Sequence, residues 1–392
     1  MHPQTKMATS TSNLSPVLAA RNELFFELNV QNEPEYAIRQ AVIFIQSTLG
    51  GLFDLPINPN APLLSLNFDN SYEFDLQAIL QDNPHFQSVA RPNLQSPIAR
   101  RMPNFCLNYQ VQSKILAQSI TLNSETFIAI NAKISRKIAK ENVGSFFQNR
   151  LNVNNQFMFL QHGPRYRIVS ENSPSFLYFM FNLDPCPEGA IVVVEFYDQD
   201  FSVVRTENFY EIHGIKQNDV FEFNVSLDKL QDILPTEAFQ TYSVSLKLID
   251  DSGNISEQYT ERFYYYITDE LTDVPERTLY FKNLSGVWDT FRITESMLTT
   301  TEYSREQFTN EKLETLDTSI QLTDKLTIHS GLLTQGWLPY LIEELCASKE
   351  IYYCTETETV RLRCISQNIE DDSFKANEQV VLEFEIAQKT QY

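Results

Sequence analysis

The stretch YSVSLKLIDDSGN, residues 242–254, alternates apolar and polar side chains and then ends in turn-forming residues. Successive side chains of a β-strand point to opposite faces, so one face of this stretch is apolar throughout. The residues on that face are Tyr242, Val244, Leu246 and Leu248. Asp-Ser-Gly-Asn at 251–254 is typical of a tight turn between two strands. The segment therefore predicts a half-buried strand that leads into a β-hairpin.

The same alternation recurs along the chain and decides the predicted fold class. Other examples are ELFFELNV (23–30), TFIAINAKI (126–134) and FEFNVSL (221–227). Asn, Pro, Ser and Gly separate these runs, which is typical of antiparallel β-sandwiches. We therefore expect a mainly β protein with two tandem antiparallel β-sandwich modules and a C-terminal α+β domain.

A similarity between two segments of the chain favours a duplication of one sandwich module. SYEFDLQAILQDNP (71–84) resembles VFEFNVSLDKLQDILP (220–235), each a strand followed by a short helical turn closed by Pro. Chance similarity of two short apolar turns is the alternative. Polar stretches at 149–156 and 268–277 mark the predicted boundaries. The predicted parts are a flexible N-terminal arm (1–20), module 1 (21–150), module 2 (156–268) and the C-terminal domain (275–392).

The C-terminal domain is predicted to contain one amphipathic helix, within GLLTQGWLPYLIEELCASKEIYYC, residues 331–354. Leu338, Leu341, Ile342 and Leu345 form an apolar stripe with helical spacing, and Thr334 is placed to cap the helix. We expect the stripe to pack on a sheet formed by 351–354, 360–364 and 380–386. Glu343 and Glu344 lie off the stripe and are expected to face water or a partner subunit.

The composition excludes several classes of function. The 392-residue chain has a net charge of −21, so it lacks the basic footprint of a nucleic-acid-binding protein. The short basic clusters Arg100-Arg101 and 136–140 are expected to be solvated or to pair with acidic neighbours. No apolar run approaches the length of a membrane span. Only 10 residues are glycine, and no phosphate-binding glycine motif is present.

The cysteines favour a protein made in a reducing compartment. There are five, at 106, 186, 346, 354 and 364, an odd and widely spread set typical of free thiols. The N-terminal residues lack an apolar segment long enough for a signal peptide. Synthesis in a reducing cytoplasm, without export, is the expectation.

The sequence offers no convincing catalytic, cofactor or metal site. His162 is followed by Gly-Pro and is interpreted as a turn residue, since no nucleophile motif accompanies it. Cys346, Cys354 and Cys364 with His329 lack the CxxC spacing of a zinc site and are interpreted as small buried residues. The acids near residue 250 lack the spacing of a calcium loop. The expectation is a non-enzymatic protein without a cofactor.

Three strands are apolar on both faces: SFLYFMFNL (175–183), AIVVVEFY (190–197) and RFYYYI (262–267). Such strands are either central in their sandwiches or meet another subunit with one face. Tyr264, Tyr265 and Tyr266 are candidates for an interface, for core packing, or for a platform that stacks on sugar rings.

The C-terminal third resembles a known family. PERTLYFKNLSGVWDTFRI (275–293) and LTIHSGLLTQGWLPYLIEELCASKEIYYC (326–354) resemble tail-associated structural proteins of phages and prophage-like elements of Bacteroidetes-type bacteria. The matching family features are an FLNSLGGWDTF-like hairpin and a helix followed by an SSPEVYL-like strand. Ser285-Gly286 replaces Gly-Gly, and Lys349 replaces Pro. The resemblance covers roughly 270–390 and involves structural motifs.

The resemblance implies a structural subunit of a phage or phage-like tail, tail tip or baseplate. Its partners would be copies of itself and other virion proteins. The alternative is a carbohydrate-binding or adhesin-like surface protein, in which exposed aromatic rings stack on sugars. A hydrolase acting on cell-wall or capsular sugar would need two carboxylates in one cleft, and no such pair stands out.

Overall fold

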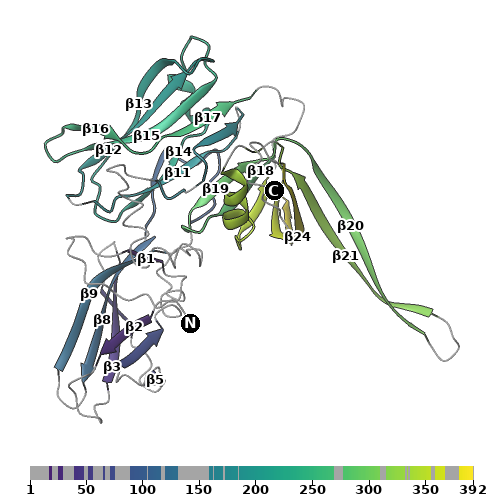
Figure 1. Ribbon diagram of the computed structural model, residues 1–392, viewed down its shortest axis with the longest axis horizontal. Helices are drawn as coiled ribbons and strands as arrows, with labels where there is room; N and C mark the ends of the chain where they lie inside the picture. Colours follow the sequence, from purple (N-terminus) through teal and green to yellow (C-terminus); the bar gives the residue numbers. More distant parts are fainter. Residues whose placement is uncertain are drawn as a thin grey trace.

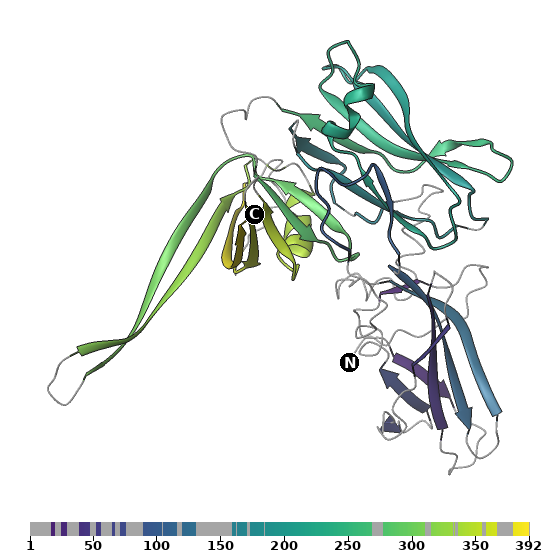
Figure 2. The same ribbon diagram turned by 180° about the vertical axis from the view of Figure 1, so that it is seen from behind.

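The protein is mainly β, as the alternating segments predict. The computed structural model describes the backbone of strands between residues 17 and 75 and then the following ranges. They are 89–103, 105–115, 120–130, 159–161, 163–170, 173–183, 185–268, 277–309, 315–331, 333, 336–354, 358–366 and 379–391. The strands in these ranges form five sheets (Figures 1 and 2).

Two of the sheets are formed mostly by the first third of the chain. A five-stranded sheet has the order β1-β9-β8-β3-β4, and a three-stranded sheet has the order β2-β6-β5. The strands of the larger sheet are β1 (Val17–Ala19), β3 (Arg39–Ser47), β4 (Leu52–Leu55), β8 (Cys106–Ile115) and β9 (Ile120–Ile130). Those of the smaller sheet are β2 (Phe25–Asn29), β5 (Ser65–Leu66) and β6 (Ser71–Asp75).

The second sandwich consists of a six-stranded and a three-stranded sheet. The larger sheet has the order β10-β17-β15-β12-β13, with β16 also paired to β15, and the smaller has the order β11-β14-β7. The larger sheet contains β10 (Tyr166–Val169), β12 (Gly189–Tyr197), β13 (Val203–His213), β15 (Thr241–Ile249), β16 (Ile255–Tyr259) and β17 (Phe263–Ile267). The smaller contains β7 (Ala99–Arg101), β11 (Phe176–Met180) and β14 (Val220–Asn224), and a 3-10 helix η1 (Leu227–Ile233) follows β14.

The turn predicted from residues 251–254 joins β15 to β16, so the hairpin prediction is confirmed. The Asp250 carboxylate accepts hydrogen bonds from the backbone N–H groups of Ser252 (2.9 Å) and Asn254 (2.8 Å). Gly253 has a φ of +79°, which a glycine adopts without a Cβ penalty. The acidic residues here therefore serve the turn.

Strand β11 explains why a strand can be apolar on both faces. Its odd-numbered residues, Leu177 and Phe179, join the core between the two sheets of the sandwich. Its even-numbered residues, including Tyr178 and Met180, join a second cluster that contains Trp288 of the C-terminal domain. The three-stranded sheet is thus a middle layer with a core on each side. Strand β12 lies inside its sheet, so for it the interpretation as a central strand is confirmed.

Strand β7 lies within the range assigned to module 1 but pairs with β14, in the range assigned to module 2. Arg100 forms an ion pair with Glu222 at 2.7 Å, and Arg101 forms one with Asp219. The expectation that this basic pair meets acidic neighbours is confirmed. Cluster 136–140 and the helical turn expected after β6 lie outside the described residues.

The C-terminal domain is a seven-stranded sheet with the order β19-β18-β22-β23-β24-β21-β20. One short helical segment packs on it (Figure 1). The strands are β18 (Thr278–Lys282), β19 (Trp288–Arg292), β20 (Met297–Thr309), β21 (Thr315–His329), β22 (Ile351–Cys354), β23 (Glu358–Cys364) and β24 (Val381–Gln391). The helical segment consists of α4 (Trp337–Tyr340) and a π-helical turn η2 (Leu341–Leu345).

The predicted packing of the helical stripe is confirmed. Leu338, Leu341 and Leu345 are buried, and Ile342 is partly buried against them. They share one core with residues of β22, β23 and β24, namely Ile351, Tyr353, Val360, Leu362, Leu382 and Phe384.

The helix differs from the prediction in its start and its form. Its N-terminal cap is Gly336, with a φ of 91° and no side-chain hydrogen bond, while Thr334 lies outside the described residues. The backbone N–H of Cys346 donates to the carbonyl of Leu341 at 2.8 Å, one residue further than in an α-helix. No described helix is both long and apolar enough to cross a membrane.

Strands β20 and β21 form a hairpin that continues far beyond the sheet. Both views show it projecting from the C-terminal domain (Figures 1 and 2). Strand β21 pairs with β24 only over Lys325–His329, whereas it pairs with β20 along the length of β20. We call residues 301–309 and 315–324 the hairpin extension.

Candidate functional site

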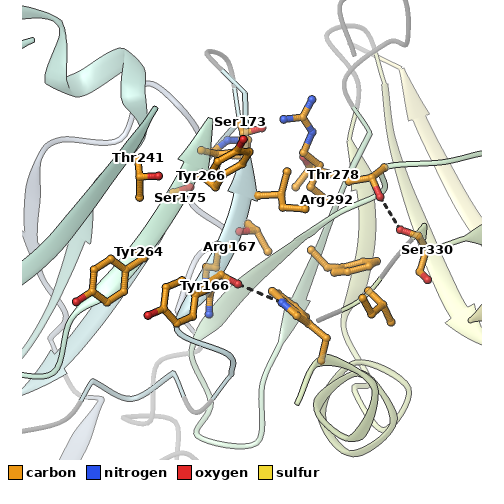
Figure 3. A pocket seen from close by; sticks show the side chains of 18 of the residues that line it. Tyr166, Arg167, Ser173, Ser175, Thr241, Tyr264, Tyr266, Thr278, Arg292 and Ser330 are labelled. Carbon is orange, nitrogen blue, oxygen red and sulfur yellow. Dashed lines mark hydrogen bonds between the residues drawn. The ribbon is translucent and has the colours of Figure 1, made fainter. Parts of the chain in front are cut away.

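A pocket of about 330 Å³ lies between the second sandwich and the C-terminal domain (Figure 3). One wall comes from β10 and β17 of the sandwich. The other comes from β18, β19 and the start of the helix. This volume lies at the lower end of the range of about 300–1,000 Å³ that is usual for small-molecule sites.

The sandwich wall carries a row of tyrosines. Parallel pairing of β10 and β17 puts Tyr166 opposite Tyr264, and Ile168 opposite Tyr266. The rings of Tyr166 and Tyr264 stack with centroids 4.9 Å apart and an interplanar angle of 13°. Tyr166 is 57% exposed and Tyr266 is 38% exposed. Figure 3 shows the two stacked rings side by side.

Phe201 adds a further exposed ring to the pocket lining. It lies in the turn between β12 and β13 and is 54% exposed, and its ring is tilted against that of Tyr197 with centroids 6.1 Å apart. Its φ is 59°, in the left-handed region that a residue with a large side chain rarely adopts. The Asp198 carboxylate holds the turn by accepting hydrogen bonds from the backbone N–H groups of Asp200 and Ser202, both at 2.9 Å. An exposed aromatic ring is thus held in a strained conformation, which is typical of functional positions.

The side chain of Arg167 points away from the tyrosine row and anchors the C-terminal domain. Alternation along β10 turns it inward, where it is 5% exposed. Its two terminal nitrogens donate to the carboxylate of Asp289, one of them at 3.1 Å, and the Tyr340 hydroxyl donates to the same carboxylate. The guanidinium carbon lies 5.9 Å from the centre of the Trp337 ring. We call Arg167, Asp289 and Tyr340 the interdomain triad.

The environment of the triad favours its charged pair. Burial alone would lower the pKa of Arg167, but the adjacent Asp289 carboxylate raises that pKa above its ordinary value. Burial, reinforced by Asp289, also raises the pKa of Tyr340, so this phenol stays protonated and can donate. A Cβ at Gly163 would lie 2.8 Å from a Tyr340 ring carbon. The absence of a side chain at Gly163 therefore lets Tyr340 reach Asp289.

The opposite wall of the pocket is fixed to the sandwich by Trp337. Its indole N–H donates to the backbone carbonyl of Tyr166 at 3.2 Å (Figure 3). Its ring packs on Phe291 of β19, with centroids 5.4 Å apart. The pocket lining also includes hydroxyl groups from both walls, among them those of Ser173, Thr241, Thr278 and Thr290.

The structure separates the three tyrosines grouped by the sequence analysis. Tyr264 and Tyr266 line the pocket. Tyr265 requires a correction, because it is fully buried and stacks on Tyr242 with centroids 4.8 Å apart. Strand alternation is the physical reason, since it turns Tyr265 into the sandwich core. Of the three roles expected for these tyrosines, Tyr265 takes core packing.

The two glutamates of the helix are also separated. Glu343 is exposed, as expected. The expectation for Glu344 is wrong, because it is 4% exposed and its carboxylate accepts a hydrogen bond from the backbone N–H of Leu284. Glu344 lies three residues after Leu341 and four after Tyr340, both of which are buried, so helical spacing places it on the buried side of the helix. From there its carboxylate reaches the β18–β19 hairpin.

The other sequence candidates do not assemble into a site. In the described part of the chain, no three His, Cys, Asp or Glu side chains come together in a way that could hold a metal ion. The five cysteines are free thiols. His162 lies outside the described residues. Tyr166, Phe201 and Trp337, which the sequence analysis did not single out, come from three distant segments, and only their aromatic character marked them.

Comparison with known proteins does not identify a family. No family model matches the sequence, and no curated protein sequence matches it. The plexin A4 extracellular region is 11% identical over 94% of this chain and 35% of that one, with a TM-score of 0.17. This chain thus spans about a third of that plexin structure.

Two further solved structures are similarly distant. A Ca²⁺-stabilised adhesin with which an Antarctic bacterium binds ice is 8% identical over 93% of this chain and 94% of that one, with a TM-score of 0.15. Domains 3–5 of the Drosophila OTK extracellular region are 9% identical over 81% and 91%, with a TM-score of 0.18. Similarities at these scores establish neither a shared overall fold nor a function.

Proposed function

We propose that the protein is a non-enzymatic structural subunit of a phage or phage-like tail, made in the bacterial cytoplasm and assembled through protein–protein contacts. The observation that carries this proposal is the hairpin extension. Residues 301–309 alone span about 30 Å at ~3.3 Å per residue. The two strands of such a hairpin give each other little stabilisation. The hairpin is therefore only marginally stable without a third strand or a covering layer.

The extension has features of a surface that binds another protein chain. Its strand β20 is the last strand of the seven-stranded sheet, so within the described residues its outer edge pairs with no strand of that sheet. Residues 298–305 are all exposed, and among them Leu298 is 57% and Tyr303 is 69% exposed. Unpaired backbone groups and exposed apolar side chains together favour pairing with another chain.

Each face of the hairpin near the sheet carries a polar cross-strand contact. Lys325 forms an ion pair with Glu302 at 2.6 Å, and the Thr301 hydroxyl donates to Asp324 at 2.7 Å. These contacts stiffen the base of the hairpin as it leaves the sheet. A stiff projecting element suits a subunit that reaches a neighbouring copy, so we propose a second copy of this chain as the partner.

Excision of the extension tests the proposal. Thr300 and Lys325 are cross-strand partners, so residues 301–324 are replaced by Asn-Gly, which closes a two-residue hairpin. We expect the full chain to form oligomers that grow with concentration in light scattering and in negative-stain electron microscopy. The excised chain is expected to stay monomeric with an unchanged helix and sheet content by circular dichroism.

A matched pair of point variants sharpens this test. Tyr303→Ser removes an exposed ring of the extension, while Tyr210→Ser removes an exposed ring of β13. Only Tyr303→Ser is expected to weaken assembly. A full-length chain that stays monomeric at millimolar concentration, and whose gene has no tail genes beside it, would overturn the proposal.

A further inference from the structure

We propose that the pocket between the second sandwich and the C-terminal domain binds a neutral pyranose ring of a glycan. This is a second role, separate from assembly through the hairpin extension, because the pocket and the extension share no lining residue. The inference rests on ring geometry, on the hydroxyl groups of the walls and on the charges near the pocket.

The stacked tyrosines supply a flat apolar surface of the right kind. The rings of Tyr166 and Tyr264 are stacked and almost parallel, and Tyr166 is 57% exposed, so the outer face of the Tyr166 ring is open to a ligand. The axial C–H groups of a pyranose form an apolar patch that packs on an aromatic face. The phenol hydroxyl at the edge of each tyrosine can bond the equatorial hydroxyls of the same sugar.

The exposed ring of Phe201 is held by a turn with a strained backbone. A phenylalanine with a φ of 59° is strained, and its 54% exposed side chain gains little from the core. The strain has a simple explanation if the exposed ring contacts a ligand beside the tyrosine row. Within the sandwich the Phe201 ring meets Tyr197 at a tilted angle and stays largely exposed, whereas Asn or Gly would fit this backbone better.

The hydroxyl groups of the walls distinguish a sugar from a purely apolar ligand. Thr241 and Thr278 line the pocket and are nearly buried, at 2% and 6% exposed. A hydroxyl can donate one hydrogen bond and accept two, so these threonines can form hydrogen bonds with a ligand. An apolar ligand that covered them would leave these hydroxyls unpaired, which is unfavourable, while a sugar brings its own hydroxyls.

The charges around the pocket favour a neutral ligand and binding without hydrolysis. Two arginines line the pocket. The buried guanidinium of Arg167 is neutralised by Asp289 and is not offered to an anion, while the guanidinium of Arg292 has the N–H donors that sugar hydroxyls accept from. Among the described residues, no Asp or Glu lines the pocket, so these residues do not supply the two carboxylates that glycoside hydrolysis requires.

A neighbouring hollow offers room for a longer glycan. It has a volume of about 630 Å³, is lined by Asp198, Asp200 and Gln240, and shares Tyr266 with the first pocket. Carboxylate and amide oxygens accept hydrogen bonds from sugar hydroxyls. A chain of sugars could therefore continue from the first pocket past Tyr266.

The experiment begins with an array of neutral mono- to tetrasaccharides built from hexoses and N-acetylhexosamines, probed with the full chain. The strongest glycan is then titrated calorimetrically into the wild type and the variants. Phe201→Asn removes the ring and relieves the backbone strain, so it should bind at least tenfold more weakly while unfolding no earlier than the wild type. Tyr166→Ala should weaken binding to a similar extent.

Two controls separate this inference from a general loss of structure and from the assembly role. Tyr210→Ala removes an exposed ring of the same sandwich outside the pocket and should leave the affinity unchanged. The chain without the hairpin extension should bind the glycan as tightly as the full chain. A failure of the excised chain to assemble would not affect the conclusion about glycan binding. A failure of the chain to bind glycans would likewise not affect the conclusion about assembly.

Three results would overturn the inference. The first is no binding of any neutral glycan at millimolar concentration. The second is binding that Phe201→Asn and Tyr166→Ala leave unchanged in folded protein. The third is capture of aromatic or aliphatic peptides from a display library, weakened by the same two variants, which would assign the pocket to a peptide side chain.

Discussion

At the scale of single residues, Asp289 accepts hydrogen bonds from both terminal nitrogens of Arg167 and from the Tyr340 hydroxyl in a place closed to water. Asp289→Ala leaves the Arg167 charge buried without its carboxylate. The free energy of unfolding is therefore expected to fall by about 3–5 kcal/mol. Urea denaturation measures this loss.

Two comparisons show whether the loss comes from the buried charge. Arg167→Met combined with Asp289→Leu removes both charges and should cost less than Asp289→Ala alone. Glu302→Ala breaks the ion pair with Lys325, in which Glu302 is 59% exposed, and should cost under about 1 kcal/mol. A loss for Asp289→Ala as small as that for Glu302→Ala would show that the triad contributes little.

Cys364 carries the second prediction at this scale. A hydrogen bond from Cys346 lowers the pKa of the Cys364 thiol, and burial only partly opposes this effect. Burial raises the pKa of Cys186 and Cys354. Near pH 7 we therefore expect iodoacetamide to alkylate Cys364 faster than Cys186 or Cys354, as followed by peptide mass spectrometry.

The pH dependence of this reaction follows from the sign of the shift. A lowered thiol pKa stabilises the folded state above the ordinary thiol pKa, and this contribution is lost as the pH falls through the lowered value. Alkylation should slow over the same fall in pH. Cys346→Ala removes the donor and should slow alkylation of Cys364 near pH 7, and an unchanged rate would contradict the assigned cause.

Alternation made part of the site predictable at the residue scale. It fixes that Tyr264 and Tyr266 share a face and that Tyr265 faces the other way. It does not say which face meets the core, because that depends on the strands of a distant segment. Glu344 was mispredicted for a different reason, since the predicted stripe left out Trp337 and Tyr340, whose burial shifts the buried face of the helix to include Glu344.

At the scale of elements, the helical segment and its sheet form one core. Leu341 is fully buried against β22, β23 and β24. Leu341→Ala is therefore expected to lower the free energy of unfolding by about 2–5 kcal/mol. Glu343→Gln changes an exposed residue of the same helix and should alter it by under about 0.5 kcal/mol. An unchanged melting temperature for Leu341→Ala, with assembly lost, would make the stripe an interface.

Elements with a local signal were predictable, and those defined by distant pairing were not. The sequence patterns of the helical stripe and of the β15–β16 turn each lie in one contiguous segment. The pairing of β7 with β14 joins residues more than a hundred positions apart, and no local feature of Ala99–Arg101 indicates it. The length of the hairpin extension was missed because its Thr-rich strands lack a regular apolar face that would mark them as part of a core.

At the scale of the whole molecule, the contact between the second sandwich and the C-terminal domain has the close packing and buried hydrogen bonds of a protein interior. Trp288 packs in a cluster with residues of β11 and donates its indole N–H to the Val89 carbonyl at 2.7 Å. The Gln161 amide donates to the Trp288 carbonyl at 3.3 Å. The pocket owes its shape to this contact, so its residues could not be assembled from the sequence one segment at a time.

Such a contact predicts that the second sandwich and the C-terminal domain unfold together. The chain has two tryptophans, Trp288 at the contact and Trp337 in the C-terminal core, so single-tryptophan variants report on each place. Val192→Ala, in the core of the sandwich, should cost about 2 kcal/mol. In a Trp288→Phe background, it should lower the urea midpoint read by Trp337 fluorescence, although Val192 and Trp337 belong to different cores.

The matching measurement uses Trp288 fluorescence in a Trp337→Phe background, where Val192→Ala should shift the midpoint by a similar amount. A C-terminal domain that unfolded on its own would keep the Trp337 midpoint unchanged. In that case the interdomain triad would act as a hinge contact, and the pocket would open and close as the two domains separate. A shared shift instead means that the pocket walls are held in place before any ligand arrives, which lowers the ordering cost of binding.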